Sequence, residues 1–306
     1  MMNHNASRSP AGRHRSGARR PAGGGTRRSH ARVRRIGLSG IVLAVVFLIG
    51  LGLLLYPTVS NWWNSRRQSQ AIVEYTEQTS AMDKAHVAEL LEAARQYNAG
   101  LAADEGRFTP TPADTTEYEN LLDVSDTGIM GYLEIPKLDV STPIYHGTDA
   151  SVLQSGAGHL EGSSLPVGGK GTHAVLSGHR GLPSSKLFTD LDDMEQGDVF
   201  MIHVLDRTLT YQVDQIVTVD PYDMDDLAID PDQDYCTLVT CTPYGINTQR
   251  LLVRGHRIPN RTAAQADAAP QTEATSPIRI AVIAAIVVAA AAIATVVTVR
   301  LVRHRR

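Results

Sequence analysis

Residues 235–250 read YCTLVTCTPYGINTQR and contain both cysteines of the 306-residue chain, Cys236 and Cys241. The run YCTLVTC is rich in β-branched residues and ends at a Thr-Pro-Tyr-Gly turn signal, so it predicts a β-strand. In a strand, five residues at about 3.3 Å each place the two Cα atoms more than about 15 Å apart, whereas a disulfide needs less than about 7 Å. The strand therefore predicts two free thiols, with Cys236 in the core and Cys241 lifted toward the surface at the strand end.

Further β-rich runs, separated by Gly, Pro and Asp turns, surround this strand in the sequence. With YCTLVTC they make seven, the others being GYLEI, DVSTPIY, HAVLSG, DVFMIHVL, TLTYQVDQIVTV and RLLVRGHRI. Seven such runs with only short helices between them predict a β-barrel or sandwich of about 130 residues. Upstream, apolar residues at helical spacing over residues 68–101 predict one or two amphipathic helices, and residues 102–120 are expected to form a loop.

Two apolar runs lie outside this region. Residues 36–56 carry no charge, and about 21 helical residues span roughly 30 Å, the thickness of a bilayer core. A second, Ala-rich run covers residues 280–299. Arginines without any acid flank the terminal side of each run, so the positive-inside rule predicts two spans with both termini in the cytoplasm. A cleaved signal peptide is the alternative for the first run, but no small-residue cleavage site follows it.

These features divide the chain into consecutive segments. The expected boundaries are a basic cytoplasmic tail at 1–35, a transmembrane helix at 36–56, N-terminal helices with a possible lid loop at 57–130, a β-barrel at 131–260, a stalk linker at 261–278, a second transmembrane helix at 279–300 and a basic cytoplasmic end at 301–306. The part between the spans, residues 57–278, holds all 32 acidic residues but only 14 of the 29 Lys and Arg. Its formal net charge is therefore −18. Such an acidic body is not expected to bind nucleic acid, and the basic tail is expected to fix topology and contact anionic lipid.

A cysteine nucleophile needs a proton acceptor and a group that stabilises charge on the attacked carbonyl. His179 stands at a strand exit between glycines, in LSGHRGLP, where the backbone can turn and expose the imidazole. Arg250 opens the next strand after Cys241, and a hairpin through TPYGINTQ would set the two side by side. An arginine keeps its charge and offers a fork of donors, which suits an anionic tetrahedral centre. Arg250 and Arg254 share a face by strand period, so spacing alone leaves both open.

Four stretches together resemble one known family. TLVTC, the arginine of CTPYGINTQRLLVRGHR, GTHAVLSGHRGLP and IPKLDVSTPIYHGT are similar to the sortases, most of all to the class C, pilin-polymerising members of Gram-positive bacteria. The similarity covers roughly residues 68–258 and fits the two spans as well. It implies a mainly β, closed eight-stranded sortase-type barrel, and therefore one strand beyond the seven above. It also implies a catalytic site of Cys241, His179 and Arg250, with Thr240 helping to shape the substrate site.

The resemblance implies transpeptidation without a cofactor. The Cys241 thiolate would attack the Thr carbonyl of an LPxTG-like sorting signal, Arg250 would hold the oxyanion, and His179 would protonate the leaving Gly amine. His179 would then deprotonate a lysine amine of the next pilin subunit. The expected partners are the membrane and pilin or surface proteins with such signals, and the expected location is the cell membrane with the catalytic domain outside.

No metal is expected, because the sequence contains no CxxC or HxxxH set. The acids of DMDDLAIDPDQD are interpreted as a solvated loop, with a Ca²⁺ site as the alternative.

One segment departs from the family pattern. Many class C sortases carry an N-terminal lid with an Asp-Pro-aromatic triplet, which residues 102–120 lack. Phe108 with Asp104 or Glu105 is the lid candidate, and an open or absent lid is the alternative. The housekeeping class, which attaches proteins to cell-wall peptide, is the enzymatic alternative. Two non-enzymatic alternatives are a membrane-anchored surface protein with merely buried cysteines, and a substrate of such enzymes, for which APQTE at 269–273 is a faint signal.

Overall fold

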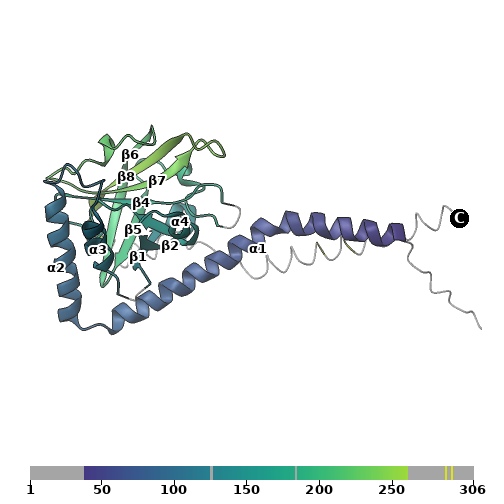
Figure 1. Cartoon of the computed structure of the whole chain (residues 1–306), viewed down its shortest axis with the longest axis horizontal. Coiled ribbons are helices and arrows are strands. Elements are labelled where there is room, and N and C mark those ends of the chain that lie inside the picture. Colours follow the sequence, from purple (N-terminus) through teal and green to yellow (C-terminus); the bar gives the residue numbers. More distant parts are fainter. Residues whose placement is uncertain (1–37, 125–126, 183–184, 261–286, 288–290, 292–306) are drawn as a thin grey trace, which may run out of the picture. The chain divides into compact units, whose positions relative to one another are not determined.

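The computed structural model describes residues 38–124, 127–182 and 185–260, together with Val287 and Ala291. Eight strands within these residues close into a barrel in the order β1-β2-β3-β4-β7-β8-β6-β5 (Figure 1). The strands are β1 Ile129–Ile135, β2 Val140–His146, β3 Ala157–His159, β4 Thr172–Ser177, β5 Val199–Val204, β6 Arg207–Val219, β7 Asp234–Thr242 and β8 Gln249–Ile258. The predicted closed eight-stranded barrel is therefore confirmed.

Strand β3 is the eighth strand, which the sequence pattern did not reveal. It has only three residues, AGH, and pairs parallel with β2 and antiparallel with β4. A run this short shows no alternation, so its strand character comes from barrel closure and not from its own composition. Its central residue must be glycine, because a Cβ on Gly158 would lie 2.4 Å from the Gly147 carbonyl oxygen.

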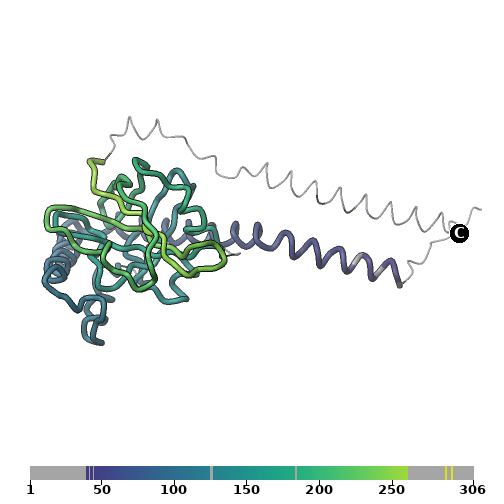
Figure 2. Tube along the Cα trace, turned by 90° about the horizontal axis from the view of Figure 1, so that it is seen from above, coloured from purple at the N-terminus to yellow at the C-terminus, as the bar shows by residue number. Residues whose placement is uncertain are grey.

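Within residues 38–260, the helices described lie mainly before the barrel. They are α1 Leu38–Ala81, α2 Lys84–Leu101, α3 Pro112–Asn120 and α4 Ala150–Ser155, with the short 3₁₀ turns η1 Pro136–Leu138, η2 Leu191–Asp193 and η3 Asp225–Leu227. The end of α1 and the whole of α2 account for the helical pattern predicted over residues 68–101. Helix α2 buries Val87, Leu91 and Ala94 in the main core, and it lies along one side of the barrel in both Figure 1 and Figure 2.

The expected loop at residues 102–120 is wrong in its second half, where α3 forms. Thr111 and Asp114 make a reciprocal capping box, and Pro112 occupies the first turn of the helix. Both features stabilise the start of a helix. The capping box satisfies backbone N–H groups that have no partner within the helix, and proline has no N–H group that would need one. The first half of the segment, residues 102–111, connects α2 to α3.

Helix α1 contains the one stretch among the described residues that is long and apolar enough to cross a membrane. Within Val45–Ala81, an 18-residue window reaches a mean hydropathy of 1.6. The second predicted span, at 279–300, lies outside the described residues except for Val287 and Ala291, and so do the stalk at 261–278 and both basic ends. One candidate span is therefore found, and the prediction of two is not confirmed.

The C-terminal half of α1 is tied to the barrel by hydrogen bonds. The buried Tyr75 hydroxyl donates to the Met130 carbonyl at 3.0 Å and accepts from the Leu205 amide at 2.7 Å. Two further bonds join α1 to segments that connect the barrel strands. Gln68 Nε2 donates to the carbonyl of Ser155, at the end of α4 (3.0 Å), and the Lys186 amide donates to Asn61 Oδ1 (2.8 Å). The C-terminal half of α1 is therefore packed as part of the barrel domain.

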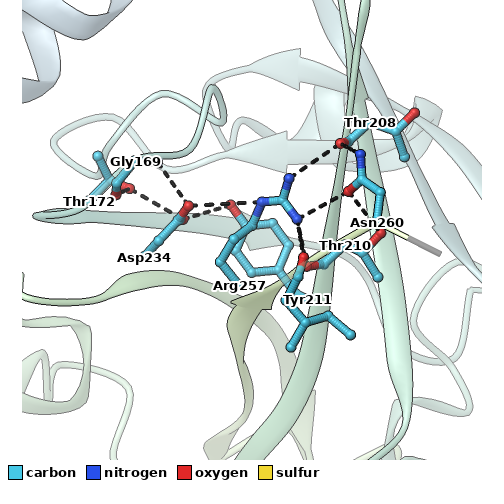
Figure 3. A network of polar contacts seen from close by, with 9 residues as sticks. Gly169, Thr172, Thr208, Thr210, Tyr211, Asp234, Arg257 and Asn260 are labelled. Carbon is cyan, nitrogen blue, oxygen red and sulfur yellow. Dashed lines mark hydrogen bonds and ion pairs between the residues drawn. The ribbon is translucent and has the colours of Figure 1, made fainter. Parts of the chain in front are cut away.

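A polar network fixes the beginning of β7, the strand that holds both cysteines (Figure 3). Asp234 accepts hydrogen bonds from the Gly169 amide at 2.8 Å and from the Tyr211 hydroxyl at 2.9 Å, and it lies 3.9 Å from the Arg257 guanidinium. Burial raises the pKa of the Asp234 carboxyl above its usual value. Because Tyr211 belongs to β6 and Arg257 to β8, the network links the start of β7 to two other strands and to the loop before β4.

Candidate active site

Strand order brings the three candidate residues together. Strand β7 pairs antiparallel with β8, and Cys241 stands directly opposite Arg250 in the register. On its other side, β7 pairs parallel with β4, with Ser177 opposite Val239. His179 follows two residues after the end of β4, so it emerges at the end of the sheet where Cys241 lies. The thiol thus has a histidine from one neighbouring strand and an arginine from the other.

A cavity of about 360 Å³ lies at this end of the barrel. Cys241, His179, Arg250 and Thr240 all line it. The remaining wall is mostly apolar and comes from Thr148, Leu153, Leu160, Val175, Ser177, Gly178, Val219, Pro221, Asp223, Met224, Leu227, Val239 and Leu252. The structure therefore gathers the expected catalytic residues Cys241, His179 and Arg250, together with Thr240, around one mainly apolar space.

The two cysteines have different surroundings although they share one strand. Both are free, as the strand geometry predicted. Cys236 is fully buried in the main core, and this burial raises the pKa of its thiol well above the usual value. Cys241 is half-buried and faces the cavity. Since the thiolate is the nucleophilic form, only Cys241 is placed to react.

His179 is half-buried, and loss of solvent lowers the pKa of its imidazole below the ordinary value of 6.5. Its ring is therefore neutral near pH 7, and a neutral imidazole has a free nitrogen that can accept a proton. The backbone of this residue is held in place, because its carbonyl accepts a hydrogen bond from the Phe188 amide at 3.2 Å.

Thr240 holds the strand exit that carries His179. Its buried hydroxyl donates to the Gly178 carbonyl at 2.7 Å, while the Gly178 amide donates to the Val239 carbonyl at 3.0 Å. Glycine is required at 178, because a Cβ there would lie 2.6 Å from the Phe188 ring. Thr240 thus fixes the β4–β7 junction beside the cavity, in addition to lining it.

Arg250 and Arg254, between which the strand period could not choose, occupy different positions relative to the cavity. Arg250 lines the cavity, and its Nη1 donates to the Gln249 carbonyl at 3.1 Å. Arg254 lies four residues further along β8 and binds Asp214, with Nε 3.0 Å from Oδ1. Four strand residues correspond to about 13 Å, so the shared face does not bring Arg254 to Cys241.

Arg180 is a structural residue that the sequence did not reveal. Its side chain is only 9% exposed, forms an ion pair with Asp192 and donates from Nη1 to the Thr242 hydroxyl at 3.1 Å. It therefore fastens the segment after β4 to the end of β7. Its only signal in the sequence is its place next to His179, because both of its partners are distant along the chain.

The lid candidates Asp104 and Phe108 lie in the connection between α2 and α3. Asp104 Oδ1 accepts a hydrogen bond from the Gly106 amide at 2.8 Å, and Phe108 packs against the cluster of Val175, Leu227 and Leu252. Neither residue is among those that line the cavity around Cys241.

The acidic segment at residues 223–234 uses several carboxylates for local hydrogen bonds. Asp223 accepts from the Asp225 amide, Asp230 from the Asp232 amide, and Asp226 from the Gln215 side chain, at 2.7 to 3.1 Å. Over the part of the chain that the structure describes, no group of three or more His, Cys, Asp or Glu side chains is arranged to hold a metal ion.

Comparison with known proteins gives consistent matches. The profile of the family described as "Sortase domain" matches residues 133–258. The crystal structure of sortase C1 from Streptococcus agalactiae is 50% identical with a TM-score of 0.61, and the match covers 63% of this chain and 100% of that one. The structure of sortase C from Streptococcus pneumoniae, reported for catalysis and pilin substrate specificity, is 50% identical with a TM-score of 0.57, covering 63% and 98%.

Among curated proteins, sortase D of Bacillus subtilis is 31% identical over 131 residues. That match covers 42% of this chain and 63% of the relative, slightly less than two thirds of its length.

Proposed function

This chain belongs to the sortase family of cysteine transpeptidases, within class C, and from that premise we propose that it cleaves an LPxTG-like sorting signal and joins the acyl fragment to a lysine amine of a pilin subunit. One observation carries this proposal: the free thiol of Cys241 lines the same cavity as the His179 imidazole and the Arg250 guanidinium. These three groups supply a nucleophile, a proton carrier and a stabiliser of negative charge.

The first half-reaction breaks the peptide bond of the signal. The Cys241 thiol gives its proton to His179, and the thiolate sulfur attacks the Thr carbonyl carbon, so that a C–S bond forms. Arg250 donates hydrogen bonds to the oxyanion that develops. The C–N bond to Gly then breaks, and His179 returns the proton to the leaving amine. The product is a thioacyl enzyme and a free Gly-containing fragment.

The second half-reaction joins the acyl group to its acceptor. A neutral lysine amine attacks the thioacyl carbon, His179 takes the surplus proton, and the C–S bond breaks as the new C–N bond forms. The thiolate then recovers a proton. His179 suits both halves, because the lowered pKa keeps the ring neutral and ready to accept a proton near pH 7.

The cavity wall supports a signal that begins with apolar residues. Leu160, Val175, Leu227 and Leu252 contribute apolar side chains next to the reacting groups. Burying a Leu side chain in such a space is worth about 1.5–3 kcal/mol, so the wall favours the Leu-Pro part of the signal.

Location and acceptor are supported by two findings. The apolar stretch of α1 supports anchoring in the cell membrane, and we propose that the barrel lies outside the cell. The similarity to a sortase C described for pilin substrate specificity supports a pilin acceptor over a cell-wall peptide. A housekeeping role is the second candidate, and acceptor choice distinguishes the two.

The test uses the detergent-solubilised full chain with an LPxTG-type peptide. Mass spectrometry is expected to find a thioacyl adduct on Cys241, which Cys241→Ala abolishes and the matched variant Cys236→Ala retains. An added lysine peptide is expected to receive the acyl group, with a glycine-type cell-wall amine as the competing acceptor. Absence of any adduct contradicts the proposal, and transfer to the cell-wall amine alone favours the housekeeping role.

A further inference from the structure

One side of the cavity is formed by a loop that connects β6 to β7. We call residues 220–228 the wall loop. It contributes Pro221, Asp223, Met224 and Leu227 to the cavity lining. Leu227 is 5% exposed, so its side chain is held firmly between the cavity and the structure behind it.

The α2–α3 connection reaches the wall loop from outside the cavity. Arg107 Nη2 donates a hydrogen bond of 3.0 Å to the Leu227 carbonyl, across 120 residues of sequence. The Arg107 guanidinium also lies 4.5 Å from the centre of the Phe108 ring, which orients both side chains. The Phe108 ring packs against Val175, Leu227 and Leu252, and all three of these residues line the cavity. Phe108 therefore supports the same wall from behind.

Residues 107–108 pack directly against Gly162. A Cβ at Gly162 would lie 2.0 Å from the Arg107 carbonyl oxygen and 3.1 Å from the Phe108 ring, and the residue has φ +86°. The absence of a side chain thus permits direct contact between residues 107–108 and the backbone that follows the cavity residue Leu160.

A second hydrogen bond holds the next carbonyl of the wall loop. His173 of β4 is buried, and its pKa is lowered to about 4 by loss of solvent, so its ring is neutral. Its Nδ1 lies 2.8 Å from the Ala228 carbonyl, which can only accept, and its Nε2 lies 2.7 Å from the Thr237 hydroxyl. Two successive carbonyls of the wall loop are therefore held by hydrogen bonds. Arg107 of the N-terminal segment binds the Leu227 carbonyl, and His173 of the barrel binds the Ala228 carbonyl.

We propose that Arg107 and Phe108 are positioning residues that hold the wall loop in the shape that recognises the sorting signal. They act from behind the wall and not by covering Cys241. Their removal is expected to weaken peptide recognition while leaving the reactivity of the thiol unchanged. The identity of the peptide rests on the proposed function, whereas the support of the wall loop does not.

The test compares Arg107→Ala with Glu105→Ala, an exposed position in the same connection, in the full-length protein. Loss of the hydrogen bond to Leu227 is expected to raise KM for an LPxTG-type peptide about three- to tenfold. Both kcat and the rate of Cys241 alkylation by iodoacetamide are expected to stay within about twofold of the wild-type values. Hydrogen exchange of residues 220–228 is expected to accelerate in Arg107→Ala and to stay unchanged in Glu105→Ala.

Two further variants keep the inference testable if Arg107→Ala fails to fold. Arg107→Lys retains one donor and is expected to recover part of the KM. Gly162→Ala displaces residues 107–108 by steric contact and is expected to reproduce the rise in KM and in exchange. Faster alkylation with unchanged KM would show that the segment covers the cysteine and would overturn the proposal, as would unchanged exchange in the wall loop. An enzyme that turns over no peptide argues against the proposed function, while the exchange result still decides this inference.

Discussion

Cys241 and Arg250 are directly opposite residues of one antiparallel strand pair, β7 and β8, and both side chains line one cavity. Opposite residues in such a pair have Cβ atoms about 4.5–5.5 Å apart. The pairing of β7 with β8 therefore places these two residues side by side at the cavity, in the register that the hairpin sets.

Replacing Arg250 with Lys is expected to lower kcat/KM about 10²-fold or more, because a single ammonium cannot reproduce the fork of donors toward the oxyanion. Arg254→Lys is the matched control, since Arg254 pairs with Asp214 away from the cavity. Steady-state kinetics with an LPxTG-type peptide measure both variants. Equal losses in the two variants would contradict the role proposed for Arg250.

Removing the imidazole with His179→Ala is expected to lower kcat about 10²- to 10⁴-fold, the usual contribution of a general acid–base group. Burial lowers the pKa of His179 from 6.5, so the neutral ring persists to more acidic pH than in a free histidine. The acidic limb of the kcat/KM profile is therefore expected below pH 6.5. The exposed His86 supplies the control variant, His86→Ala, which is expected to keep the wild-type profile. An acidic limb above neutrality would argue against this protonation state.

The hydroxyl of Thr240 is expected to matter for both stability and rate. Thr240→Val removes the donor to the Gly178 carbonyl and leaves a buried acceptor unpaired, which costs about 1–3 kcal/mol of unfolding free energy. Because Gly178 precedes His179, kcat is expected to fall as well. Thr240→Ser retains the hydroxyl and should preserve most of the rate. Denaturant unfolding and peptide kinetics check this, and an equal effect of Val and Ser would count against the hydrogen bond.

Two buried histidines are expected to make the fold sensitive to acid. The pKa values of His159 and His173 are lowered to about 4, chiefly by loss of solvent, against 6.5 for an ordinary histidine. The unfolded chain therefore binds more protons between these values, so their contribution is complete above pH 6.5 and is lost as pH falls toward 4. Each contributes on the order of 2–3 kcal/mol.

Urea unfolding followed by circular dichroism at pH 7 and pH 5 measures this loss of stability. His173→Gln is expected to reduce the pH dependence, whereas His86→Gln, at an exposed site, is expected to leave it unchanged. Equal pH dependence in all three proteins would contradict the assignment.

The parts of the fold that could be predicted are those that depend on local sequence. The strand of Cys241 shows in its β-branched run, and the position of Arg250 follows from a hairpin with a readable turn. The capping box of Thr111 and Asp114 was also readable, and the loop expected there was an error of interpretation. Strand β3 could not be found, because three residues carry no pattern.

Contacts between distant segments could not be derived from spacing. His179 reaches Cys241 through the parallel pairing of β4 with β7, and only the family resemblance supplied that proximity. The bond from Arg107 to Leu227 crosses 120 residues, and Arg107 carries no local signal of a buried partner. Such contacts follow from the closure of the barrel, which fixes positions that the local sequence leaves open.

The hydrogen bonds of Asn61, Gln68 and Tyr75 fasten α1 to the barrel over about four helical turns. Under the proposed membrane anchoring, the anchor and these contacts belong to one helix, which also contains Pro57. The barrel would then work close to the lipid surface, and sorting signals would have to reach the enzyme at that surface.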